Sequence, residues 1–126
     1  MAHERMYSEK DPYLKEIRAV CLALPEAVEI EAWGRPTFRA GEKGKMFAVL
    51  TGYVEKNYSV IFKPEPDDAA ALRADDRFYV AKYHPKELAL DFTKAAVDWD
   101  EVAELMEGSY RQVASKRLLK AFDERG

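Results

Sequence analysis

The sequence contains one cysteine, Cys21, and two histidines, His3 and His84, among its 126 residues. One thiol cannot form a disulfide within the chain, and a metal site usually takes three or four ligands from cysteine, histidine and carboxylates. These counts argue against a disulfide framework and against a histidine- or cysteine-based metal centre. Cys21 falls between Val20 and Leu22 on the apolar side of a predicted helix, so we expect a buried, unreactive thiol. We expect no metal and no cofactor.

Long apolar runs are also absent. No stretch approaches the roughly 20 residues that a helix needs to cross a bilayer, and residues 1–10 lack the apolar centre of a secretion signal. We therefore expect a cytoplasmic protein with no membrane partner. The length suits one domain. We predict a flexible tail over residues 1–11 and a single domain over residues 12–126, and no feature indicates an oligomeric state.

The net charge of −3 is unevenly distributed along the chain. Residues 35–63 hold six basic and two acidic side chains, whereas residues 64–108 hold five basic and twelve acidic ones. An acidic chain is a poor nonspecific binder of polyanions, but a basic stretch can still form a local patch that binds anions. A second basic stretch, residues 109–126, would extend that patch if the two stretches met in space.

Hydrophobic periodicity predicts the helices and strands. Apolar residues at helical spacing predict a helix over residues 12–24, opened by Asp11-Pro12. Apolar alternation interrupted by turns predicts strands at residues 28–33, 45–51, 57–63, 78–83 and 87–92, with a weaker one at 36–40. A short helix is predicted over 64–74. Asp98 is predicted to cap a helix that Gly108 ends, and Ser109 to open the last helix.

The order of these elements indicates the fold class. Strands joined by short connections form antiparallel sheets, and amphipathic helices before and after them favour a layered arrangement. We predict an α+β fold: a two-layer α-β-α sandwich, with an antiparallel sheet of four to five strands and the helices on one face.

Five short motifs occur in order over about residues 12–122. They are Leu24-Pro25, Gly44-Lys45-Met46-Phe47-Ala48, Phe62-Lys63-Pro64, Tyr83-His84, and residues 109–117 (SYRQVASKR). In these motifs the chain resembles the MmcQ/YjbR family of small bacterial proteins. The resemblance implies a CyaY-like (frataxin-like) fold. Members are often labelled as DNA-binding, through a proposed "double wing" arrangement, so the resemblance also implies DNA as a partner. It implies no agreed catalytic residues.

The main candidate site is a set of basic residues in and beside the predicted strands: Arg35, Arg39, Lys43, Lys45, Lys56 and Lys63. Side chains on a sheet face or a hairpin tip can contact phosphates, and the nearby Phe38, Tyr53 and Tyr58 can stack on bases. A secondary set lies in the last predicted helix: Arg111, Lys116 and Arg117. The alternative for both sets is structural, as a solvated sheet face and as cations that complement a helix dipole.

Two further motifs bear on function. His84 has no nucleophile or carboxylate placed beside it by a motif, so we predict a structural hydrogen-bonding role and rank an enzyme last. Trp33 either covers the edge of the core, which we favour, or forms the rim of a ligand groove. The predicted function is therefore a DNA-binding module that uses a basic face of the sheet. The alternative is a small-ligand- or protein-binding domain without catalytic activity.

Overall fold

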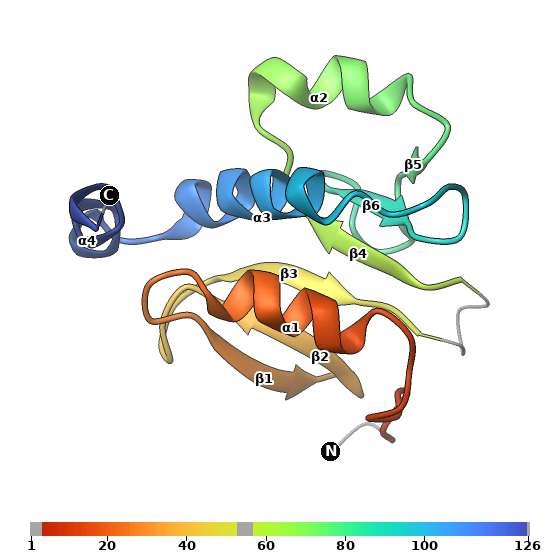
Figure 1. Ribbon diagram of the computed structural model, residues 1–126, viewed down its shortest axis with the longest axis horizontal. Coiled ribbons are helices and arrows are strands. Elements are labelled where there is room, and N and C mark those ends of the chain that lie inside the picture. The colour runs from red at the N-terminus through yellow and green to blue at the C-terminus, as the bar shows by residue number, and fades with distance from the viewer. Residues whose placement is uncertain (1–3, 53–56, 126) are drawn as a thin grey trace.

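The computed structural model describes residues 4–52 and 57–125 (Figure 1). The sheet is antiparallel throughout, and its strands are β1 (Val28–Ala32), β2 (Arg35–Arg39), β3 (Met46–Leu50), β4 (Ser59–Phe62), β5 (Phe78–Tyr79) and β6 (Leu88–Asp91). Their spatial order is β1-β2-β3-β4-β6-β5. The predicted α+β class is confirmed, with six strands rather than four to five. The segment centred on Phe38 forms a full strand despite Pro36. This proline is opposite Glu31 of β1 and precedes Thr37, the first residue of β2 that pairs with β3.

The helices are α1 (Leu14–Leu22), α2 (Pro66–Arg73), α3 (Trp99–Val113) and α4 (Lys116–Glu124). Helices α1 and α3 lie side by side over one face of the sheet (Figure 1). Each buries one side: Leu14, Ile17 and Cys21 from α1, with Val102, Met106 and Tyr110 from α3. Among the described residues, no helix is both long and apolar enough to cross a bilayer.

The two central strands bury residues on both faces of the sheet, because successive side chains point to opposite sides. Val60 and Phe62 of β4 belong to the core under the helices. Ile61, between them, packs with Val49 of β3 and Ala89 of β6 in a smaller cluster on the opposite face. These three residues are direct partners across the ladder. We call this second side, away from α1 and α3, the open face.

The C-terminal helices differ from the prediction. Gly108 does not end a helix and Ser109 does not open one, since α3 runs through both to Val113. Ser109 is fully buried, and its Oγ donates to the carbonyl of Phe47 (2.6 Å) and accepts the N–H of Lys63 (2.9 Å). The hydroxyl that resembles a helix cap therefore fastens α3 to the sheet. Ser115 caps α4 instead, accepting the N–H of Leu118.

The first helix also begins later than predicted. Its first residue is Leu14, and Asp11 accepts the N–H of Ser8 rather than capping the helix. At the other end of α3 the prediction is confirmed, because Asp98 accepts the N–H groups of Asp100 and Glu101. Cys21 is fully buried, and burial raises the pKa of its thiol, which keeps it protonated and unreactive near neutral pH.

Candidate ligand groove on the open face

A groove crosses the open face of the sheet. Two neighbouring cavities, of about 410 and 470 Å³, have the lining residues Trp33, Arg35, Tyr83 and His84 in common, so we describe them together. Each volume lies in the range typical of small-molecule sites. The lining also includes Met6, Val49, Thr51, Asn57, Ile61, Tyr79, Ala81 and Lys82. The floor is the apolar cluster of the central strands, and we call the whole depression the groove.

One wall of the groove is formed by the chain after Tyr79, where it leaves the sheet. A strand was predicted over residues 78–83, but β5 ends at Tyr79 and the next strand begins at Leu88. The connection folds into successive turns, with His84 N–H donating to Ala81 and Glu87 N–H donating to His84. Residues 81–84 line the groove together with Trp33 and Arg35, although β5 and β1 are opposite edges of the sheet.

Two exposed aromatic residues on the rim have an uncommon backbone conformation. Trp33 (φ 54°) and Tyr83 (φ 71°) have positive φ, which is rare for bulky side chains. They are 48% and 84% exposed, so burial of their own rings does not explain this conformation. Strained residues of this kind concentrate at functional sites. Trp33 also lies outside the main core, so the favoured prediction for it, a cover over the core edge, is wrong.

Basic side chains line the groove, and its described lining holds no carboxylate. Arg35, Lys82 and His84 line it, and the Lys82 ammonium lies 5.2 Å from the centre of the Tyr83 ring. Although the chain has 23 acidic residues, none of the described lining residues is an aspartate or a glutamate. Glu87 stands behind His84, with its Oε1 3.4 Å from His84 Nδ1. The local field therefore favours an anion.

One end of the groove is built from neutral hydrogen-bonding groups. Asn57 Nδ2 donates to the Tyr79 hydroxyl (3.1 Å), which donates in turn to Ser59 Oγ (2.8 Å). Behind them, Asp91 accepts Asn57 Nδ2 (3.4 Å) and the Thr93 hydroxyl (2.6 Å). Burial opposes ionisation of Asp91, but these hydrogen bonds outweigh it and hold its pKa below the ordinary value. The network fixes the Asn57 and Tyr79 side chains where they can meet a ligand.

The basic residues predicted in and beside the strands are dispersed, and one of them lines the groove. Arg35 lines the groove. Arg39 is half-buried at the end of β2, and its Nε has no hydrogen-bond partner among the described residues. Lys43 and Lys45 are exposed in the β2–β3 turn, and Lys63 is exposed directly after β4. Lys56 lies outside the described residues.

The secondary set on the C-terminal helices is mostly paired. Arg111 contacts Asp123 (3.0 Å) and Glu107 (3.6 Å), and Arg117 forms a two-point ion pair with Glu26. Lys116 is exposed and has no ion pair among the described residues. No group of three or more histidine, cysteine, aspartate or glutamate side chains in the described chain is arranged to hold a metal ion.

The helices packed on one antiparallel sheet define a small two-layer α+β domain. A family model described as YjbR matches residues 22–112, and the chain belongs to the YjbR family, as the sequence motifs indicated. Among solved structures it is similar to the crystal structure of Deinococcus radiodurans protein DR2400, which contains a DUF419 domain. That structure shares 21% identity and a TM-score of 0.68, over 89% of this chain and 86% of that one. No curated protein matches the sequence.

These comparisons concern family and fold. At 21% identity the likeness to the Deinococcus radiodurans protein is one of fold alone. The CyaY-like description, the cytoplasmic location and DNA as a partner stay predictions. The groove residues that sequence reasoning missed, above all Asn57, Tyr79 and Lys82, carry no motif.

Proposed function

We propose that this protein binds a small molecule that combines a planar ring with a negatively charged group, and that the groove on the open face is its site. The observation that carries the proposal is the composition of the lining. Two exposed aromatic residues with positive φ stand beside three basic side chains and an apolar floor, without a carboxylate among the described lining residues.

Each part of the groove has a role in this proposal. Trp33 and Tyr83 supply π-faces for a planar ring, and such stacking contributes about 1–3 kcal/mol per base in proteins that bind single-stranded nucleic acid. Arg35 supplies a planar set of N–H donors that suits carboxylate or phosphate, with Lys82 adding charge. Asn57 and Tyr79 offer hydrogen bonds at the neutral end, which orient a ligand.

The proposal is one of binding without turnover. Among the described lining residues His84 is the one imidazole, and its described partner is Glu87. No described contact joins His84 to a nucleophile: the Thr51 hydroxyl donates to the carbonyl of Asn57, and the described lining includes no serine, cysteine, aspartate or glutamate.

The test uses three probes that separate ring from charge: adenosine 5′-monophosphate, adenosine and inorganic phosphate. Binding is followed by two-dimensional NMR of the labelled protein. We expect the nucleotide to bind more tightly than either part, with shifts at Trp33, Arg35 and His84. Arg35→Gln should weaken nucleotide binding about 10- to 100-fold, because it removes a charge-assisted contact, while adenosine binding should hardly change. Trp33→Ala should weaken both.

The matched control is Lys116→Gln, which removes an exposed cation outside the groove lining. It should leave all three affinities unchanged. Equal loss in the control and in Arg35→Gln would mean that general charge, not the groove, governs binding. Absence of shifts with every probe in the millimolar range would refute the proposal.

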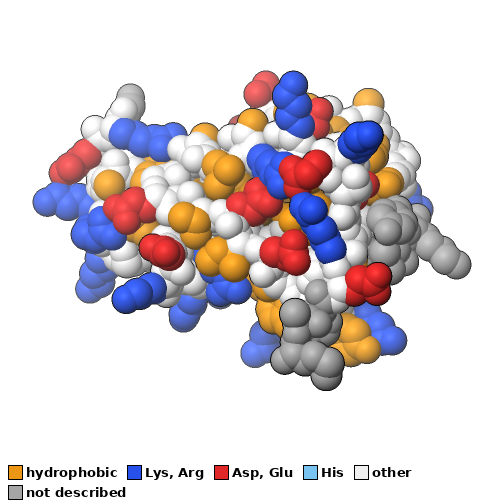
Figure 2. Space-filling model, turned by 90° about the horizontal axis from the view of Figure 1, so that it is seen from below, with side chains coloured by type: hydrophobic (Ala, Val, Ile, Leu, Met, Phe, Trp, Pro, Cys, Tyr) orange, Lys and Arg blue, Asp and Glu red, His pale blue; other side chains and the backbone are white. Residues whose placement is uncertain are grey.

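DNA binding is the second candidate, and a different surface favours it. The β2–β3 turn lies close to α4: a Cβ placed on Gly41 would be in van der Waals contact with Leu118 Cδ1, at 3.9 Å. Lys63 lies beside the end of α3, where its carbonyl accepts Gln112 Nε2. Exposed lysines from three segments therefore gather near the junction of α3 and α4, and Figure 2 shows blue side chains grouped at the left end, where α4 lies. These lysines are Lys43, Lys45, Lys63 and Lys116.

If this surface binds DNA, affinity should fall steeply with salt and depend little on sequence, because contacts go to phosphates. The slope of log K against log salt is negative, and we expect Lys45→Gln and Lys116→Gln each to reduce its magnitude by about one. Arg35→Gln, in the groove, serves as the matched control and should not change it. Fluorescence-anisotropy titrations of a labelled duplex at several salt concentrations measure the affinity and the slope. A slope unaffected by the two lysine substitutions would exclude this surface.

A further inference from the structure

The chain before α1 contacts the turn that carries the rim of the groove. Met6 N–H donates to the carbonyl of Gly34 (2.8 Å). The approach is so close that a Cβ on Gly34 would lie 2.1 Å from the carbonyl oxygen of Glu4. Gly34 also has a φ of 77°. Its neighbours Trp33 and Arg35 both line the groove, so the segment lies directly behind that wall.

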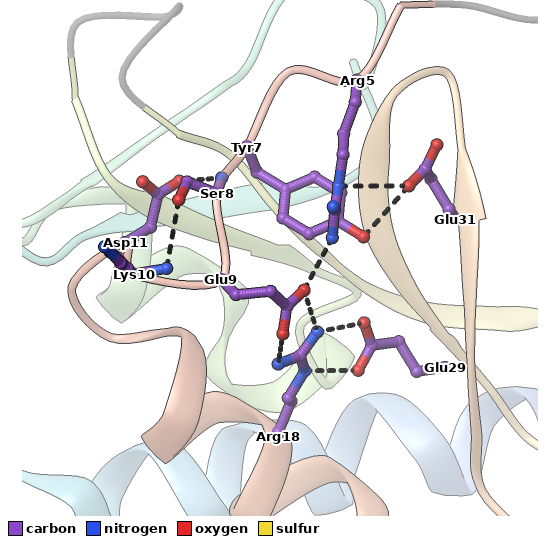
Figure 3. A network of polar contacts seen from close by, with 9 residues as sticks. All are labelled: Arg5, Tyr7, Ser8, Glu9, Lys10, Asp11, Arg18, Glu29 and Glu31. Carbon is purple, nitrogen blue, oxygen red and sulfur yellow. Dashed lines mark hydrogen bonds and ion pairs between the residues drawn. The ribbon is translucent and has the colours of Figure 1, made fainter.

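Polar contacts hold this segment to β1 (Figure 3). The Tyr7 hydroxyl donates to Glu31 (3.0 Å), and Arg5 Nε lies 3.6 Å from the same carboxylate. Arg5 also stacks over the Tyr7 ring, with its guanidinium carbon 4.1 Å from the ring centre. Glu31 is two residues from Trp33. The contacts therefore join the segment to the strand immediately before the β1–β2 turn.

A second set of contacts ties the same segment to α1. Arg18 lies between Glu9 (2.6 Å) and Glu29 (2.7 Å), with both carboxylates hydrogen-bonded to its guanidinium (Figure 3). Glu9 also pairs with Arg5 (2.6 Å). An isolated exposed ion pair stabilises little, but several charges sharing partners in good geometry stabilise more. Helix, strand and segment are thus held by one network.

Met6 connects this network to the groove, because its side chain lines the cavity of about 470 Å³. We infer that residues 4–9 are part of the ligand site: they form one wall through Met6 and position Trp33 and Arg35 through Gly34 and Glu31. The inference rests on the proposed function for its ligand, but the positioning itself is measurable without one. Arg5 and Tyr7 are positioning residues, since neither lines the cavities.

The test uses the full-length protein with the double substitution Arg5→Ala/Tyr7→Phe, which removes the contacts to Glu31 and leaves every lining side chain in place. Two quantities are measured: NMR order parameters of the Gly34 and Arg35 amides without ligand, and the affinity for adenosine 5′-monophosphate. We expect the order parameters to fall and the affinity to weaken about three- to tenfold, because positioning is lost. Met6→Ala should weaken binding while the order parameters stay unchanged.

The matched control is Arg117→Ala, which removes an ion pair of comparable exposure at the α4 end. It should change neither quantity. If the wild-type protein binds no probe but the double variant loosens the turn, the proposed ligand is wrong and the positioning stands. Unchanged order parameters and unchanged affinity in the double variant would overturn the inference.

Discussion

Replacing Tyr110 with alanine is expected to lower the free energy of unfolding by about 3–5 kcal/mol, the range for truncating a buried aromatic residue. Tyr110 is fully buried in the core under the helices. Its ring meets Phe47 of β3 edge-on (5.4 Å between centres) and Phe122 of α4 (5.9 Å). It therefore joins the sheet, α3 and α4, and the cavity left by its removal has walls on three elements. Urea denaturation followed by far-UV circular dichroism measures the change.

The control is Tyr110→Phe, which keeps the ring and removes the hydroxyl. That hydroxyl donates to the carbonyl of Pro25 (2.7 Å), and its loss should cost only about 1 kcal/mol. A loss in Tyr110→Phe as large as that in Tyr110→Ala would show that the hydrogen bond, rather than packing, dominates. Tyr110→Ala within 1 kcal/mol of the wild type, on the scale of a lost hydrogen bond, would contradict the packing described.

Replacing Gly44 with alanine should also destabilise the protein strongly, by about 3 kcal/mol. A Cβ at Gly44 would lie 1.9 Å from the carbonyl oxygen of Ala40. This obstacle is backbone in a tight turn, where Gly44 N–H donates to Gly41 and Ala40 N–H donates to Lys45. The turn would have to open, and hydrogen bonds that join the ends of β2 and β3 would be lost. Thermal unfolding monitored by circular dichroism gives the measurement.

Gly108→Ala is the matched control, because it adds the same methyl group at a buried glycine inside α3. Its Cβ would lie 2.9 Å from Glu65 Cγ, which belongs to an exposed, flexible side chain that can move aside. Alanine is also favoured over glycine inside a helix by up to about 1 kcal/mol. We expect this variant to be neutral or slightly more stable. A loss at Gly44 no larger than the change at Gly108 would contradict the steric conflict described for the turn.

Much of the fold could be predicted because its signals are local. The helix with Leu14, Ile17 and Cys21 on one side, the alternating strands and the cap at Asp98 all depend on neighbouring residues. The prediction was wrong where tertiary contacts override local preference. Ser109 has the pattern of a cap, yet its hydroxyl bonds to backbone groups of the sheet that lie far away in sequence.

The groove was only partly predictable for the same reason. The basic stretch drew attention to Arg35, and the Trp33 loop was considered as a ligand rim. Neither signal indicated that Tyr83 would approach them from the far edge of the sheet, because residues 78–83 have the alternation of a strand. Only the fold brings the aromatic and basic side chains together. The basic stretch, residues 35–63, also contains Lys43 and Lys45. A count of charges along the sequence could not show that Arg35 lines the groove and that these two lysines do not.

The contacts of residues 4–9 also affect how molecules of this protein meet one another. An antiparallel sheet has two outer strands whose free backbone groups can pair with another chain and start aggregation. Here β5 is only two residues long. On β1, Glu29 and Glu31 bear charge and are bound by Arg18 and Tyr7. The network beside the groove thus also makes the longer outer strand a poor template for edge-to-edge pairing with a neighbouring molecule.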